Sequence, residues 1–128
     1  MAMRGSATDN ISNLEFMQQL AGYIPGIIHR ERNNRQYIYL YKMRDYWGAF
    51  DESAFLLCRL FKNTQTSILR VAEYPFPVIM VCISDDELQK YGEKHIFRRD
   101  YQDHKVIVGT KIVAEQYWTW YRMEIEDS

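Results

Sequence analysis

The chain has 128 residues, with 16 Lys and Arg against 17 Asp and Glu, so its formal net charge is −1. This length suits one domain, and a hydrophobic content of 47% argues against a disordered chain. The near-neutral charge excludes nucleic-acid binding through an overall positive field, so any such binding requires a local basic patch. We expect one domain over residues 9–125, a flexible N-terminal tail over residues 1–8 and an acidic tail over residues 126–128.

The sequence carries no signal for a membrane or an oxidising compartment. No apolar run reaches the roughly 20 residues of a membrane helix, and the first residues lack the apolar segment of a secretory signal. Cys58 and Cys82 lie in apolar runs without a CxxC pair, which indicates buried reduced thiols. We therefore expect a cytoplasmic protein without a membrane partner.

The first predicted element is a helix over Asn13–Gly22. Ser12 and Glu15 have capping-box spacing, and apolar residues then recur on one helical face. The pair Pro25–Gly26 predicts that the helix has ended, and the polar stretch His29–Arg35 predicts a loop.

The segment Tyr37–Met43 is rich in β-formers and predicts a strand covered on both faces. Successive side chains of a strand point to opposite faces. The segment therefore separates two sets of side chains, one consisting of Tyr37, Tyr39 and Tyr41 and the other of Ile38 and Leu40. Asp51 is a candidate cap for a helix that begins at Glu52 and packs on the sheet.

Two further strands are predicted at Ser67–Tyr74 and Pro77–Ile83, and the second is apolar throughout, as expected for a central strand. Ser84 then opens a second capping box, and Gly92 marks the end of that helix.

Lys105–Val113 predicts a last strand, kinked at Gly109. Glu115–Ile125 is ambiguous, because Trp118 and Trp120 alternate as in a strand while the acids of the last residues suggest a solvated tail. The order of elements predicts an α/β (α+β) fold, with one mixed β-sheet flanked by helices.

Basic and aromatic residues overlap around the first strand. Arg30, Arg32, Arg35, Lys42 and Arg44 meet one acid, Glu31, between residues 30 and 44, a balance of 5 − 1 = +4. Four tyrosines and Trp47 lie in or beside this stretch. Cations contact phosphates and aromatic rings stack on bases or wedge between them, so the overlap suggests nucleic-acid binding. The alternative is a core strand beside a loop of solvated arginines.

Catalytic motifs are missing from the sequence. Neither a GxxxxGK[ST] phosphate loop nor a GxSxG elbow occurs, and the three histidines lack metal-ligand spacing. A less favoured alternative is a small metal-dependent nuclease built on Asp100, Asp103 and Lys105. We expect no enzyme activity, no cofactor and no metal.

The stretch YLYKMRDYWGAFDESAFLLCRLF resembles the N-terminal mismatch-recognition domain of the MutS DNA-repair family. That family has an aromatic strand leading into Met-Gly-Asp-Phe-Tyr-Glu-Leu-Phe, acidic residues and an apolar helix. The corresponding places here hold Met43, Asp45, Tyr46, Trp47 and Phe50. With weaker similarity outside this stretch, the resemblance covers about residues 12 to 116.

The resemblance implies a stand-alone domain that approaches the minor groove of DNA. The family's Phe-x-Glu motif wedges a ring beside a mispaired base and hydrogen-bonds that base through the Glu. Tyr46 stands at the wedge position and Gly48 at the Glu position, so we expect weakened or altered mismatch specificity. No counterpart of the family's ATPase domain is expected within this chain.

The function predicted from the sequence is therefore noncatalytic binding of duplex, mismatched or distorted DNA. The candidate contact residues are Tyr46, Arg44, Lys42, Arg30, Arg32, Arg35 and Trp47. The alternative is a protein-interaction module that has lost DNA contact and uses exposed aromatic residues, with Trp118 and Trp120 as candidate anchors.

Overall fold

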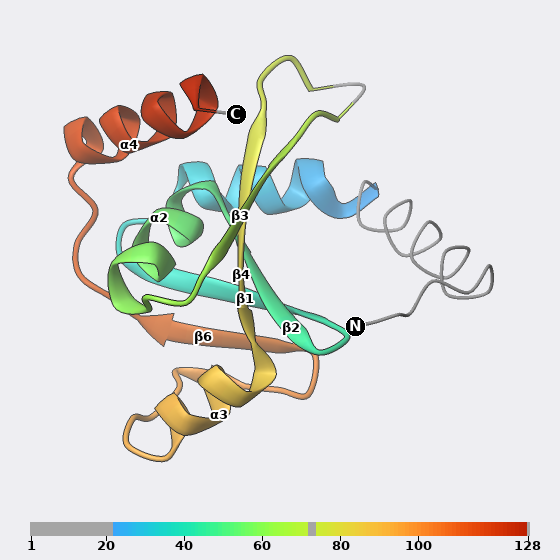
Figure 1. Ribbon diagram of the computed structural model, residues 1–128, viewed down its shortest axis with the longest axis vertical. Helices are drawn as coiled ribbons and strands as arrows, with labels where there is room; N and C mark the ends of the chain where they lie inside the picture. Colours follow the sequence, from blue (N-terminus) through green and yellow to red (C-terminus); the bar gives the residue numbers. More distant parts are fainter. Residues whose placement is uncertain (1–21, 72–73, 128) are drawn as a thin grey trace.

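The structure is a computed structural model that describes residues 22–71 and 74–127 (Figure 1). Residues 22–32 are helical, and the labelled elements follow them. In chain order these are β1 (Tyr37–Met43), β2 (Tyr46–Phe50), α2 (Asp51–Leu60), β3 (Gln65–Leu69), β4 (Val78–Ser84), α3 (Asp85–Gly92), β5 (Arg99–Asp100), β6 (His104–Val108) and α4 (Ala114–Glu126). Across these two ranges, no helix is both long and apolar enough to cross a membrane.

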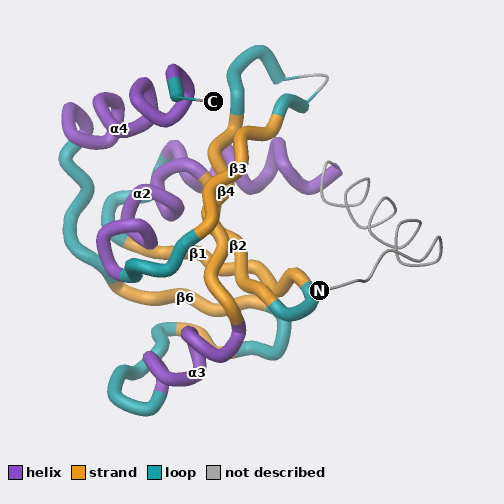
Figure 2. The backbone as a smooth tube through the Cα atoms, in the orientation of Figure 1, coloured by secondary structure: helices purple, strands orange, loops and turns teal. Residues whose placement is uncertain are grey.

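The strands form one six-stranded sheet in the order β3-β4-β2-β1-β6-β5. Each neighbouring pair is antiparallel, and β1 and β2 occupy the middle of the sheet. Helices lie around the sheet (Figure 2), with α2 packed against β1, β2 and β4. The predicted mixed α/β fold is confirmed, and β4, expected at the centre, lies second from the β3 edge.

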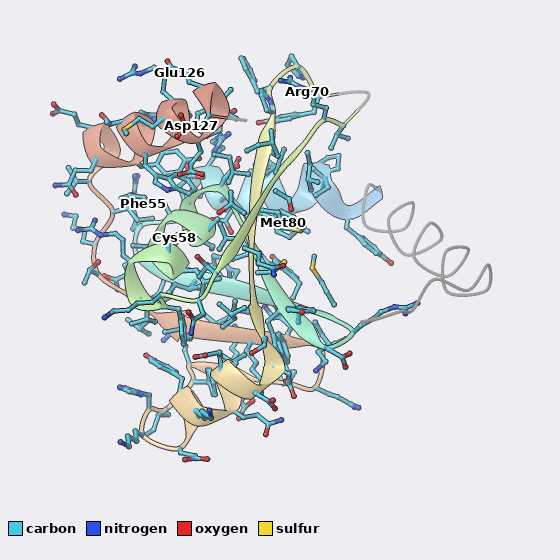
Figure 3. The ribbon with its side chains drawn as sticks, viewed as in Figure 1. Phe55, Cys58, Arg70, Met80, Glu126 and Asp127 are labelled. Atoms are coloured by element: carbon cyan, nitrogen blue, oxygen red, sulfur yellow. The ribbon has the colours of Figure 1, made fainter. Side chains whose placement is uncertain are left out.

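One side of the sheet, the α2 face, carries Ile38 and Leu40 of β1 and the main hydrophobic core. α4 in turn packs on α2, where Phe55 meets the rings of Tyr117 and Trp120 at centroid distances of 5.8 and 5.4 Å (Figure 3). The alternation of side chains along β1 therefore determines which side of the sheet is covered by α2 and, beyond it, by α4.

The opposite side, the tyrosine face, carries Tyr37, Tyr39 and Tyr41 of β1. The helix over residues 22–32 covers one end of this face with three isoleucines that pack around the end of β1, the end of β2 and the start of β4. This second core cluster consists of Ile24, Ile27, Ile28, Met43, Phe50 and Val78. Tyr37 and Tyr39 lie beyond this cluster and stay half-buried.

The helix over residues 22–32 corrects the predicted break at Pro25–Gly26 and the predicted loop over His29–Arg35. Both breaker residues are exposed, whereas Ile24, Ile27 and Ile28 bury an apolar stripe with helical spacing. Packing of this stripe outweighs the local preference of Pro and Gly against helix. The helix predicted over residues 13–22 and the tail over residues 1–8 fall almost wholly outside the described residues.

β2 was not predicted as a strand. It forms a hairpin with β1 through the two-residue turn Arg44–Asp45, with Met43 opposite Tyr46. Such turns need positive φ, which Asn and Gly favour, whereas here Arg44 adopts a φ of 59°. The sequence therefore gave no turn signal for this hairpin.

Asp51 does not cap the helix as predicted. α2 begins at Asp51 itself with Phe50 as its N-cap, and no side chain caps it. The Asp51 carboxylate instead accepts a hydrogen bond of 2.9 Å from the Ile79 N–H of β4.

The remaining elements follow the sequence with changed limits. β3 begins and ends earlier than predicted, and β6 stops at Val108 just before Gly109. Ser84 caps α3 by accepting the Glu87 N–H at 3.1 Å, as predicted, and α3 ends at Gly92. The ambiguous C-terminal segment is neither a strand nor a solvated tail but the helix α4, which extends to Glu126, the first residue of the expected acidic tail.

Candidate nucleic-acid interface

The β1–β2 turn presents two of the predicted contact residues to solvent. Arg44 is exposed and the Tyr46 side chain is 44% exposed. Gly48, two residues further along β2, is enclosed, because a Cβ placed there would lie 2.5 Å from the sulfur of Met43. A side chain at position 48 would therefore point into the second core cluster and not toward a ligand.

Lys42 and Trp47 lie on the α2 face, away from the tyrosines. Trp47 is 2% exposed and donates its indole N–H to Asp85 at 2.8 Å, which removes its ring from any stacking role. Lys42 donates to the same carboxylate oxygen at 3.2 Å. These two bonds lower the pKa of Asp85, with the Trp47 bond as the larger cause. Trp47 is thus a core residue, which corrects its assignment as a contact.

Arg32 is half-buried and pairs with two acids. Its guanidinium pairs with Asp51 at 3.2 Å and with Glu52 at 2.8 Å, and it also donates to the Tyr74 hydroxyl at 3.3 Å. Burial raises the pKa of both carboxyls, and the charge of Arg32 opposes that shift. Arg32 therefore balances the charge of the two acids at the start of α2 and is not free to pair with a phosphate.

Arg30 and Arg35 point away from that ion-pair cluster. Arg35 is exposed in the loop before β1, where its carbonyl accepts the Ile112 N–H at 2.7 Å. Arg30 is exposed over the tyrosine face, where it donates to the Tyr41 hydroxyl at 3.3 Å. The seven predicted contact residues are therefore dispersed over both faces, the turn and the interior.

A different set of residues comes together on the tyrosine face. A cavity of about 430 Å³ lies over β1, β5 and β6, and we call it the basic hollow. It is lined by Arg30, Tyr37, Tyr39, Arg98, Arg99, His104 and Val106.

Strand register positions the hollow. Tyr39 of β1 lies opposite Val106 of β6, which in turn lies opposite Arg99 of β5, so the three side chains share one face. Val106 is almost fully buried and forms the floor between them. Three short antiparallel strands thus bring together residues from positions 39 and 99.

Rings and guanidinium groups alternate across the hollow. The Tyr37 and Tyr39 ring centroids are 6.1 Å apart, and Tyr39 and His104 lie nearly parallel at 7° and 6.4 Å. The Arg98 guanidinium carbon lies 5.2 Å from the Tyr37 ring centroid, and that of Arg30 lies 5.0 Å from the Tyr39 centroid. Such cation–ring contacts orient the guanidinium groups without neutralising their charge.

The hollow is strongly positive despite the neutral chain. Three arginines line it and no acid does. Arg30, Arg98 and Arg99 are exposed, and none forms an ion pair with an acid in residues 22–71 or 74–127. Partial burial lowers the pKa of His104, against a bond between its Nδ1 and the Leu40 carbonyl, and Arg30 lowers it further. The lowered pKa favours the neutral form of the His104 imidazole.

Reasoning from the sequence found Arg30 and the tyrosines but missed Arg98, Arg99 and His104. The adjacent pair of arginines was the available signal, yet it lies about 60 positions from the tyrosines. The pairing of β5 with β6 and of β6 with β1 brings the two segments together.

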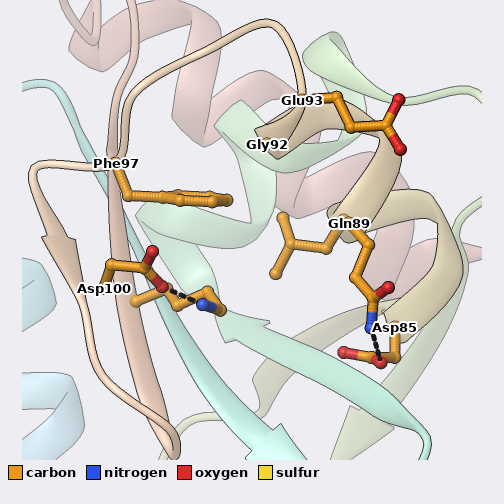
Figure 4. Close-up of a pocket in the computed structure, with 8 residues that line it drawn as sticks. Asp85, Gln89, Gly92, Glu93, Phe97 and Asp100 are labelled. Carbon is orange, nitrogen blue, oxygen red and sulfur yellow. Dashed lines mark hydrogen bonds and ion pairs between the residues drawn. The ribbon is translucent and has the colours of Figure 1, made fainter.

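The remaining candidate residues lie elsewhere. Trp118 is 45% exposed on α4, whereas Trp120 packs against Phe55. Lys105 forms an ion pair with Asp100 beside a separate cavity of about 360 Å³ under α3 (Figure 4). Within the described ranges, no three His, Cys, Asp or Glu side chains are placed to hold a metal ion.

Comparison with protein-family models, curated proteins and solved structures finds no match for this chain. The resemblance to the MutS family therefore stays a prediction that rests on the residues quoted for it.

Proposed function

We propose that this chain is a noncatalytic DNA-binding module and that the basic hollow is its main contact surface. The observation that carries the proposal is the set of three exposed arginines, without described acidic partners, around two tyrosine rings. A surface of this kind offers phosphates charge-assisted hydrogen bonds and offers bases a stacking platform.

The arrangement favours binding that does not depend on base sequence. In base-specific readout, Arg, Lys, Asn or Gln side chains project into a groove of the duplex and meet base edges with two hydrogen bonds. The hollow is lined instead by guanidinium groups over rings, which suit phosphates and ring faces. The enclosure of Gly48 also leaves no side chain there to play the part of the MutS family's base-reading Glu. The exposed Tyr46 turn remains the alternative contact that the resemblance implies.

Salt-dependent binding tests this proposal. Fluorescence anisotropy of labelled single-stranded, duplex and mismatched DNA is measured between about 50 and 200 mM salt. The double variant R98A/R99A is expected to weaken binding at least about tenfold, because two phosphate contacts are lost. R70A/R122A removes two exposed charges elsewhere on the described surface and should bind as the wild type does. Failure of the wild type to bind any of these DNAs at low salt refutes the proposal.

A second candidate function is protein interaction through α4, on which Trp118 and Met123 are exposed. Met123, but not Trp118, also lines a groove of about 530 Å³, together with Val113, Glu115, Gln116, Thr119 and Trp120. Exposed aromatic and Met side chains are frequent anchors at protein interfaces. This function is favoured if the wild type binds no DNA but binds a defined protein partner, and if the W118A variant loses that partner.

A further inference from the structure

We infer that the basic hollow takes single-stranded nucleic acid, with unpaired bases against its rings, in preference to a duplex. The inference rests on the proposed function and specifies the form of its ligand. It also moves the expected contact from a wedge at Tyr46 to a platform formed by β1, β5 and β6.

The shape of the site carries the first step. A duplex exposes only the edges of its bases, so proteins read it by inserting a convex helix, ribbon or wedge into a groove. The hollow is concave, with Val106 as its floor and Tyr37 and Tyr39 half-buried along β1. A groove cannot receive such a surface, whereas a splayed base can enter it face first.

The second step is the stacking geometry. Tyr37 and Tyr39 each have a guanidinium group over the ring, from Arg98 and Arg30 respectively, at 5.2 and 5.0 Å. Unpaired bases stack on aromatic rings and also on guanidinium planes. A base in the hollow thus meets both tyrosine rings and the guanidinium groups beside them, and its phosphates lie within reach of the same cations.

The third step is size. A cavity of about 430 Å³ lies near the lower end of the range for small-ligand sites, about 300 to 1,000 Å³. It has room for one or two bases and not for a folded nucleic acid. The backbone beyond them would leave past Arg99, which is exposed on the edge strand β5.

The experiment compares four labelled probes of about 12 nucleotides at one low salt concentration: oligo-dT, oligo-U, an abasic deoxyribose-phosphate chain and a DNA duplex. We expect oligo-dT or oligo-U to bind at least about fivefold more tightly than the abasic chain, the effect of stacking one base. We expect the duplex to bind less tightly than oligo-dT. The ratio of oligo-dT to oligo-U tells whether DNA or RNA is the ligand.

Variants tie the base effect to the hollow. Y39L keeps an apolar side chain but removes the ring, and it should reduce the preference for oligo-dT over the abasic chain. R98E reverses an exposed charge and should weaken binding of both probes. Y23L changes a tyrosine that is 69% exposed on the helix over residues 22–32 and should leave both affinities unchanged.

The outcomes separate the two claims. Duplex binding that equals or exceeds oligo-dT binding overturns the single-strand inference and leaves the proposed function standing. Equal affinities for oligo-dT and the abasic chain, or an unchanged preference in Y39L, also overturn it. Absence of binding to all four probes overturns both claims.

Discussion

Glu31 is a buried acid whose protonation should control the pH dependence of stability. Its side chain is 0% exposed in the helix over residues 22–32. The carboxyl accepts the Ser53 N–H at 2.9 Å and the Asn34 amide at 3.1 Å, and one of its oxygens lies 2.8 Å from the Ser53 hydroxyl. This network joins the helix to the start of α2, and Asn34 also donates to the Tyr37 carbonyl at 2.6 Å.

Burial raises the pKa of Glu31 from 4.5 to about 8, against the hydrogen bonds from Ser53 and Asn34, which lower it. Because the folded state holds this proton more tightly than the unfolded state, unfolding between pH 4.5 and about 8 releases it. Stability therefore falls as the pH rises through this window. At about 1.4 kcal/mol per pH unit, ionisation of Glu31 lowers the free energy of unfolding by up to about 5 kcal/mol by the upper end of this pH window.

The variant E31Q removes this ionisation while keeping the shape and a donor for the Ser53 hydroxyl. Urea unfolding is measured at about pH 5 and pH 8.5 for the wild type, E31Q and the exposed control E115Q. E31Q should match the wild type near pH 5 and exceed its free energy of unfolding by several kcal/mol at pH 8.5. A wild type and an E31Q variant with the same pH dependence would refute the reasoning, because Glu31 would then ionise freely in the folded protein.

Three further substitutions test the packing. R32A should lower the free energy of unfolding by about 3 kcal/mol in urea titrations, because Asp51–Glu52 would lose their cationic partner; no loss would mean that these acids are neutral. W120A should lower the melting temperature by several degrees more than W118A, because Trp120 packs in the α2–α4 contact; equal losses would contradict that packing. G48E should cost about 3 kcal/mol or more in urea titrations, because it would place a carboxylate beside Met43 in the second core cluster. A fully stable G48E protein would show that this position can turn outward.

Local patterns in the sequence predicted the elements whose signal lies within a few residues. The limits of β1 follow from its run of β-forming residues, and the separation of its tyrosines from Ile38 and Leu40 follows from the alternation of side chains along a strand. The capping-box spacing of Ser84 and Glu87 likewise predicted the start of α3, and the structure contains the corresponding hydrogen bond. These features need no knowledge of distant contacts.

Other elements depend on partners that the local sequence does not reveal. The β1–β2 hairpin turns through Arg44 at positive φ without Asn or Gly, so β2 had no turn signal. The helix over residues 22–32 persists through Pro25–Gly26 because three isoleucines pack against the sheet. In both cases tertiary packing outweighs local preference.

The sequence predicted the kinds of residue that form the candidate site, but not which individual residues form it. The excess of arginine and tyrosine between residues 30 and 44 suggested nucleic-acid binding before any fold was known. In the folded protein, Trp47 is buried and Arg32 is engaged in ion pairs, so neither is part of the basic hollow. The pairing of β5 with β6 and of β6 with β1 places Arg98 and Arg99 beside the tyrosines. Residue composition indicates what a surface can bind, but strand register determines which residues form that surface.

The central claim is that nucleic acid contacts the basic hollow, and a titration of isotope-labelled protein with oligo-dT followed by NMR locates that contact directly. We expect the largest amide shift changes at Tyr37, Tyr39, Arg98 and Val106, which form or line the hollow. Changes confined to the Arg44–Tyr46 turn or to α4, with none in the hollow, would contradict the account.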